Sequence, residues 1–118
     1  MSKIYKNNIE RETVTNSAYR KVIFTTPNLQ LVLMSIPVGE EIGMESHPHT
    51  TQFIRIEEGL GVAYVSGHRY NLKAGDAIIV PPRTRHNVKA TTILKLYTIY
   101  SPPVHSLGTI ERVKLHVE

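Results

Sequence analysis

The stretch that decides the fold runs from residue 47 to residue 59 and reads HPHTTQFIRIEEG. It sets two histidines, His47 and His49, just ahead of a segment in which apolar and polar residues alternate. Residues i and i+2 of an extended strand point to the same face. Two imidazoles in that arrangement can converge on one metal ion at about 2.0–2.1 Å. The pair is therefore a candidate metal site, although a bare pair of histidines can also be structural.

The alternation after this pair predicts which side chains face inward. Gln52, Ile54 and Ile56 share one face of the strand, and the two isoleucines mark that face as an apolar interior. Gln52 lies three residues beyond His49, so an unbroken strand would direct the two side chains to opposite faces. We therefore expect a turn or bulge at residues 50–51 if Gln52 is to join the histidines.

Outward from this stretch, the chain consists of short β-branched segments bounded by Gly, Pro or Asn. Eight segments of this kind are expected to be strands: 19–26, 29–36, 53–57, 61–65, 69–72, 76–80, 86–89 and 92–100. Turn signals about every ten residues indicate a sandwich or barrel. Segment 29–36 is almost wholly apolar, as in a strand covered on both faces. Ser66-Gly67 is a candidate hairpin turn.

The expected organisation is one domain over residues 1–118, with a barrel core at about 19–103, an N-terminal arm at 1–18 and a C-terminal tail at 104–118. The arm is open to three interpretations: a short helix, a frayed arm, or a strand lent to a partner. The alternating tail residues 109–117 are a candidate edge strand.

Composition excludes several classes. The chain has 118 residues, six histidines and no cysteine, so disulfides, thiolate metal sites and cysteine nucleophiles are ruled out. The longest apolar runs are too short to span a membrane, and the N-terminus lacks the apolar core of a signal peptide. We expect a cytoplasmic protein without membrane contact. The net charge of +4 comes from scattered basic residues, which favours a solvated basic surface over a nucleic-acid groove.

A second motif completes the first. It reads Gly75-x5-Pro81-x4-His86, and the first motif reads His47-x-His49-x2-Gln52-x6-Gly59. Together they resemble the two sequence motifs of the cupin superfamily, over about residues 19–103. Within that superfamily, the stretches LQLVLMSIPVGEEIG, TQFIRIEEG and KLYTIYSPPVH are similar to a subgroup labelled mannose-6-phosphate isomerase-like.

The resemblance implies an all-β fold, a double-stranded β-helix or small jelly-roll barrel, with a metal in its mouth. It assigns the metal ligands to His47, His49, Gln52 and His86. The chain departs from the family pattern in two ways that concern the metal. Only two residues separate His49 from Gln52, where three or four are usual, and Gln52 stands where glutamate is usual.

The glutamine has an electrostatic consequence. Three neutral imidazoles and a carboxamide leave the full +2 charge of a divalent ion uncompensated, which favours anionic ligands and acidifies bound water. Nitrogen and oxygen donors with open positions suit Zn, Mn, Fe, Ni or Cu.

Other residues are further candidates for the site. Glu45 shares strand parity with His47 and is a candidate acid–base group, or an exposed rim charge. His105 follows the Pro102-Pro103 turn and matches a histidine of the resembling subgroup, so it is the second catalytic candidate. Arg83 and Arg85 flank the turn before His86 and would bind an anionic substrate or be solvated. We expect the remaining histidines, His68 and His116, to face solvent.

Two functions follow from the resemblance. The first is an enzyme, an isomerase or dioxygenase, whose divalent metal binds a small anionic or hydroxylated substrate. The second is a non-catalytic module that binds a sugar or another small ligand. Small cupins often pair through edge strands, so we expect a homodimer.

Overall fold

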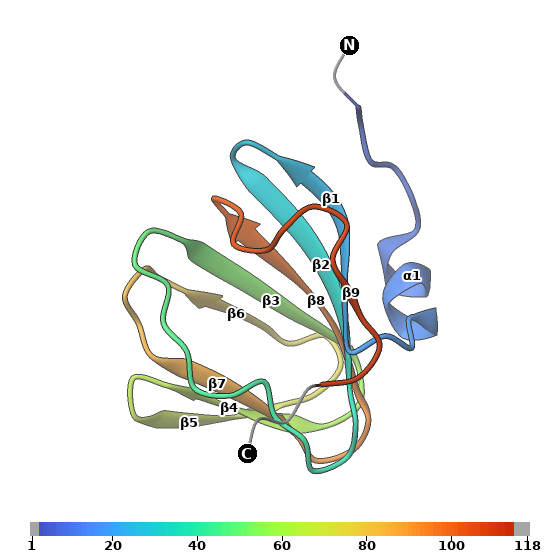
Figure 1. Ribbon diagram of the computed structural model, residues 1–118. Helices are drawn as coiled ribbons and strands as arrows, with labels where there is room; N and C mark the ends of the chain where they lie inside the picture. The colour runs from blue at the N-terminus through green and yellow to red at the C-terminus, as the bar shows by residue number, and fades with distance from the viewer. Residues whose placement is uncertain (1–2, 115–118) are drawn as a thin grey trace.

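The computed structural model describes residues 3–114, and Figure 1 shows the arrangement of its elements. One short helix precedes nine strands. The elements are α1 (Ile9–Thr15), β1 (Arg20–Thr26), β2 (Leu29–Ile36), β3 (Thr51–Glu58), β4 (Gly61–Val65), β5 (His68–Leu72), β6 (Ala77–Val80), β7 (His86–Ala90), β8 (Leu94–Ser101) and β9 (Ile110–Glu111). All eight segments expected to be strands are strands, with ends shifted by at most two residues.

The strands form two antiparallel sheets that face each other (Figure 1). The larger sheet has the order β6-β3-β8-β2-β1-β9, and the smaller has the order β5-β4-β7. Residues 39–45 run along the free side of β7 and extend the smaller sheet, through bridges from Glu41 to Lys89 and from Glu45 to His86. The fold is the expected all-β jelly-roll barrel.

The interior is built by strand alternation, because successive side chains point to opposite faces. The buried core is the following set: Tyr19, Val22, Val32, Met34, Ile36, Ile54, Ile56, Ala63, Leu72, Val88, Ala90, Leu94, Leu96 and Tyr100. In β3 the expected parity is confirmed, since Gln52, Ile54 and Ile56 are all buried. Gln52 lies opposite Tyr100 of β8, so the apolar interior ends in polar side chains at this level.

The outer face of the larger sheet is also covered. Of the three interpretations of the arm, the structure has the short helix: α1 begins at an Asn8 cap whose side chain accepts a hydrogen bond from the Arg11 amide. It lies against β2, β3 and β8. Leu31 and Leu33 of β2 alternate with the core residues and are nevertheless buried. Segment 29–36 is therefore covered on both faces, as its composition predicts.

The turns and the tail follow the expected pattern over shorter ranges. Ser66 and Gly67 both have positive φ, as a two-residue hairpin turn of type I′ requires, and they join β4 to β5. The tail supplies the edge strand β9, which pairs with β1 at Arg20 and Lys21. His116 lies outside the described residues. Within residues 3–114 no helix has the length and apolar character needed to cross a bilayer.

Candidate metal centre

Three side chains meet at the polar end of the barrel: Glu45, His47 and His86. One donor atom from each lies within 4.8 Å of the other two. These three residues are called the donor group. Glu45 Oε1 is 3.6 Å from His47 Nε2 and 3.8 Å from His86 Nε2. These separations are too long for hydrogen bonds. They are the spacing expected of separate donors around one ion at about 2.0–2.2 Å from each.

The backbone brings the first and third of these residues together. The Glu45 amide donates to the His86 carbonyl at 2.9 Å, and the His86 amide donates to the Glu45 carbonyl at 2.9 Å. Directly opposed residues of an antiparallel pair present their side chains on the same face. His86 shares that face with Val88 and Ala90 of the core, so the carboxylate and the imidazole both point inward.

His86 is held in one tautomer by its neighbour. Its Nδ1 lies 2.9 Å from the Thr84 carbonyl oxygen, and a carbonyl only accepts, so Nδ1 carries the proton and donates. The lone pair of the neutral ring is then on Nε2. This is the arrangement by which metal-bound histidines are usually oriented.

Three buried polar atoms here lack a hydrogen-bond partner: His47 Nε2, His86 Nε2 and Gln52 Oε1. Gln52 is 1% exposed, and its Nε2 donates to Thr98 Oγ1 at 3.0 Å. The amide oxygen is therefore left as the unused acceptor. Buried polar atoms nearly always have partners, and the unpaired imidazole nitrogens of His47 and His86 beside the Glu45 carboxylate fit a borderline divalent cation.

His49 is placed differently from its sequence partner. It is exposed, on a bend between His47 and β3, and it does not belong to the donor group. The extended segment ends near His47, so the alternation of a strand does not carry on to His49. The spacing contains a signal of this: four residues separate His47 from Gln52, within the three or four usual in the family, whereas two separate His49 from Gln52.

A row of aromatic rings leads from the donor group towards the C-terminal loop. The His47 ring lies 5.7 Å from the Tyr100 ring, which lies 5.2 Å from the His105 ring, both edge to face. Burial, followed by the charge of Glu45, raises the pKa of the Tyr100 hydroxyl. Burial, followed by the charge of Arg20, lowers the pKa of His105 to about 4. His105 is thus neutral at pH 7, and its Nε2 is buried without a partner.

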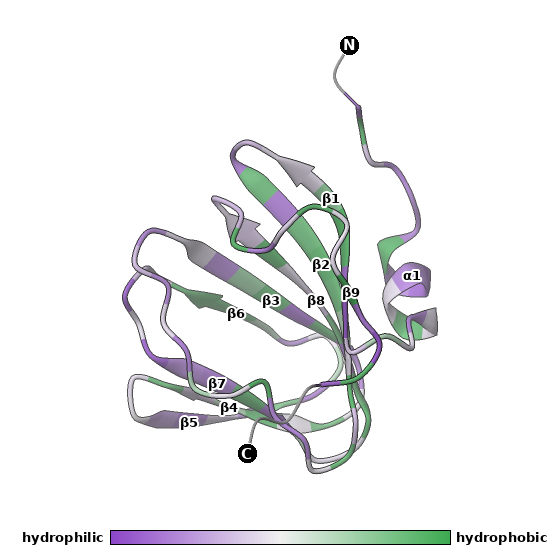
Figure 2. Cartoon of the chain, in the orientation of Figure 1, coloured by the Kyte–Doolittle hydropathy of each residue, from purple (hydrophilic) through white to green (hydrophobic). Residues whose placement is uncertain are grey.

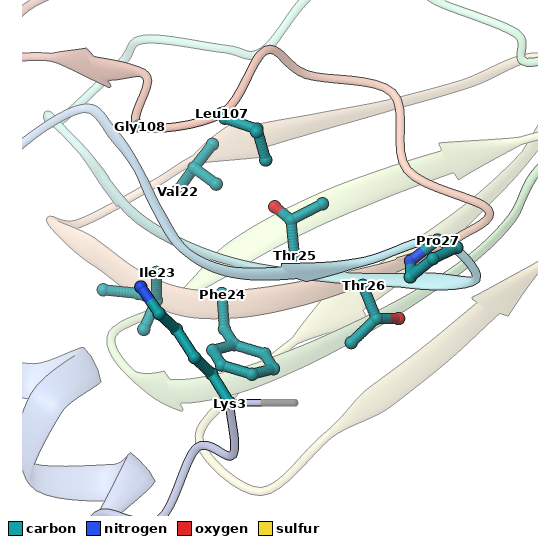
Figure 3. Close-up of a pocket in the computed structure, with 9 residues that line it drawn as sticks. All are labelled: Lys3, Val22, Ile23, Phe24, Thr25, Thr26, Pro27, Leu107 and Gly108. Atoms are coloured by element: carbon teal, nitrogen blue, oxygen red, sulfur yellow. The ribbon is translucent and has the colours of Figure 1, made fainter. Parts of the chain in front are cut away.

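Two surface grooves lie outside this donor group. A groove of about 500 Å³ runs between β1, residue Lys3 and the loop at Leu107–Gly108, and its lining is mostly apolar (Figure 3). A second groove of about 570 Å³ contains Arg83 and Arg85. Both arginines are exposed, as is His68, in agreement with the expectation for that histidine.

Comparison with known proteins agrees with this architecture. The cupin domain family matches residues 32–100. YrkC of Bacillus subtilis is 42% identical over 115 residues, which are 91% of this chain and 62% of that protein. L612 of Acanthamoeba polyphaga mimivirus is also 42% identical, over 116 residues, which are 93% of this chain and 72% of that protein. The crystal structure of BH2720 from Bacillus halodurans superposes with a TM-score of 0.91 and 42% identity, covering 93% of this chain and 89% of that one. The chain spans less than two thirds of the length of YrkC. It belongs to the cupin family.

Proposed function

We propose that this cupin binds one divalent transition metal through Glu45, His47 and His86, with the amide oxygen of Gln52 as a fourth donor. The observation that carries the proposal is the meeting of three donor atoms within 4.8 Å of one another. The proposed set replaces His49 by Glu45, because His49 is exposed and Glu45 lies beside both imidazoles.

This exchange alters the charge expected at the site. With Glu45 as a ligand, one carboxylate and three neutral donors leave a net charge of +1 around a divalent ion, instead of the +2 expected for three imidazoles and an amide. The carboxylate therefore takes over the charge compensation that a glutamate would have given at position 52. Zn, Mn, Fe, Ni and Cu all fit this donor set.

A metal held in this way supplies a Lewis acid with positions open to the oxygen atoms of a small anionic or hydroxylated ligand. Isomerase or dioxygenase chemistry is the enzymatic form of this proposal, with His105 as the acid–base group. Its support is the neutral imidazole with a buried and unpartnered Nε2, two rings away from His47 along the row His47, Tyr100, His105. The mannose-6-phosphate isomerase-like subgroup stays a prediction from the sequence.

One consequence of the proposed ligand set favours the alternative, a non-catalytic ligand-binding module. Glu45 is the other candidate acid–base group, and as a metal ligand it would not be free to move protons. His105 is then the single named group for that role. Replacing His105 by Phe separates the two functions: a binder keeps its metal and its ligand affinity, whereas an enzyme loses turnover.

The test of metal binding is elemental analysis of untagged protein after reconstitution with each metal at neutral pH. We expect stoichiometric metal in the wild type, loss of at least about 90% of it in His86→Ala, and marked weakening in Glu45→Gln, as for loss of a ligand. His49→Ala and His68→Ala, both exposed histidines, serve as matched controls and keep the metal. Metal loss in His49→Ala with retention in Glu45→Gln would restore the ligand set expected from the sequence.

We also propose that the chain forms a homodimer in the cytoplasm. The support for pairing is the outer edge of β1, which has only the two-residue β9 beside it in the part of the chain that is described. The apolar groove of Figure 3 runs along the same strand. Light scattering tests this expectation, and a monomeric mass at micromolar concentrations would contradict it.

A further inference from the structure

The second groove lies on the outer surface of the smaller sheet, on the opposite side of that sheet from the donor group. Its six lining residues come from the β4–β5 hairpin, the turn before β7 and the segment beside β7. They are Met44, Tyr64, Ser66, Gly67, Arg83 and Arg85. Its volume of about 570 Å³ is in the range of sites that hold small molecules.

Strand parity places these side chains on the outer face. In β4, Ala63 belongs to the core, so Tyr64 points away from it. In β7, Val88 and Ala90 belong to the core, and the same alternation directs Arg85 outward from the position before His86. The groove and the metal donors are therefore separated by one thickness of sheet.

The outer face of this sheet is basic. Beside Arg83 and Arg85 it carries Arg69, paired with Tyr64, and Lys89, which lies opposite Glu41. Within residues 3–114, neither Arg83 nor Arg85 forms an ion pair. Figure 2 shows hydrophilic colouring along β5 and β7. Two guanidinium groups at one groove, with no carboxylate among its described lining residues, leave an uncompensated positive potential.

The backbone holds the groove in one shape. The Ser66 amide donates to the Arg85 carbonyl at 2.9 Å, which ties the hairpin to the turn. Arg83 has φ +60°, a left-handed conformation that is uncommon for a residue with a side chain. Its amide donates to the His47 carbonyl at 2.7 Å. Strained residues held by their surroundings gather at binding sites, and a preformed groove loses less entropy on binding.

We propose that this groove binds a small organic phosphate. Arg83 and Arg85 contact the phosphate oxygens, since a guanidinium offers paired donors that match an oxyanion. The Tyr64 ring and the Met44 side chain contact the apolar or planar part of the molecule. A nucleic acid is the weaker fit, because single strands need successive aromatic platforms along a basic track, and Tyr64 is the single aromatic residue among the described residues that line this groove.

Calorimetric titration with phenyl phosphate and with inorganic phosphate tests the proposal. The wild type binds both, and phenyl phosphate more tightly. Arg83→Asn/Arg85→Gln weakens both by about tenfold or more, as for loss of charged hydrogen bonds; asparagine is chosen at position 83 because it tolerates positive φ. Tyr64→Leu weakens phenyl phosphate several-fold and inorganic phosphate little. The control Arg11→Gln/Arg112→Gln removes two exposed arginines elsewhere and leaves both affinities unchanged.

Three results would overturn it. Equal weakening in the control variant would mean attraction by net charge alone. Phosphate binding that needs added metal and disappears in His86→Ala would place the phosphate at the metal centre, so each titration is run with metal-free and metal-loaded protein. Tighter binding of a short single-stranded oligonucleotide that displaces phenyl phosphate would assign the face to nucleic acid. Metal content and thermal unfolding, measured on every variant, separate these outcomes from misfolding and from failure of the proposed metal site.

Discussion

The outer face of the six-stranded sheet is covered by α1 over β2, β3 and β8, whereas the outer face of the three-stranded sheet carries charged side chains that are exposed to water. On the larger sheet, Leu31 and Leu33 are buried on the side where α1 packs. On the smaller sheet, the corresponding positions carry Arg69 and Lys89, both exposed. A sheet buried on both sides has few positions free to change. The smaller sheet supplies one wall of the core with its inner face and keeps its outer face available for binding.

The largest expected loss of stability comes from a substitution in the connection between the two sheets. The chain passes from β3 to β4 at Gly59, where φ is +97° and an added Cβ would lie 2.1 Å from the Ile93 carbonyl oxygen. Gly59→Ala should lower the free energy of unfolding by about 4 kcal/mol, roughly half from backbone strain and half from displaced structure. Chemical denaturation measures the loss.

Gly75 is the matched control. It lies where the chain returns from β5 to β6, its φ is +94°, and an added Cβ would meet nothing within 4 Å. Gly75→Ala should therefore cost only the backbone strain, about 1–2 kcal/mol. Equal losses in the two variants would show that the close approach at Gly59 relaxes at little cost.

The next prediction compares how much the outer faces of the two sheets contribute to stability. Leu33 is 1% exposed, so Leu33→Ala should destabilise the protein by about 3 kcal/mol through lost burial and a cavity. Arg69→Ala, at an exposed position on the smaller sheet, should change stability by less than about 0.5 kcal/mol. Urea unfolding of both variants tests the difference, and a comparable loss in Arg69→Ala would mean that the smaller sheet's outer face also supports the fold.

The next prediction concerns pH, and it distinguishes the half-buried His105 from the exposed His68. The pKa of His105 is lowered to about 4 in the folded protein, while an exposed histidine has a pKa near 6.5. The unfolded chain therefore binds more protons between these values, and stability should fall as the pH decreases from about 6.5 to about 4. His105→Phe should flatten this slope and the exposed His68→Gln should not. Thermal unfolding at pH 7, 5.5 and 4.5 measures it, and an unchanged slope in His105→Phe would rule out His105 as its source.

The smallest effect concerns the cover of the larger sheet. The Asn8 side-chain oxygen accepts from the Arg11 amide at 2.9 Å, so Asn8→Ala should cost about 0.5–1 kcal/mol as a lost helix cap. Asn71→Ala, on the exposed β5, is the control and should be near neutral. Thermal unfolding followed by circular dichroism measures the stability of both variants. No difference between them would mean that packing alone holds α1 in place.

The sequence was sufficient for most of the fold, because alternation and turn residues act locally. Gln52, Ile54 and Ile56 follow the predicted parity to the residue. The candidate site was less predictable, since it depends on where an extended segment ends. The donor group contains Glu45, which is set by its long-range bridge to His86, and omits His49, which lies beyond the bend. Counting positions along one strand does not reveal such a bridge, although the spacing from His47 to Gln52 does signal that His49 is the histidine left out.

Gln30 has a consequence for hydrogen exchange at the backbone amides of the loop after β8. This residue is fully buried; its Oε1 accepts from the amides of Val104 and His105, and its Nε2 donates to the His105 carbonyl and to Thr25 Oγ1. Every donor and acceptor of the carboxamide is used. The loop after β8 is thus fastened to β2 as if by a backbone pairing. In hydrogen exchange, the amides of Val104 and His105 should be protected like those of a strand, and Gln30→Leu should release both.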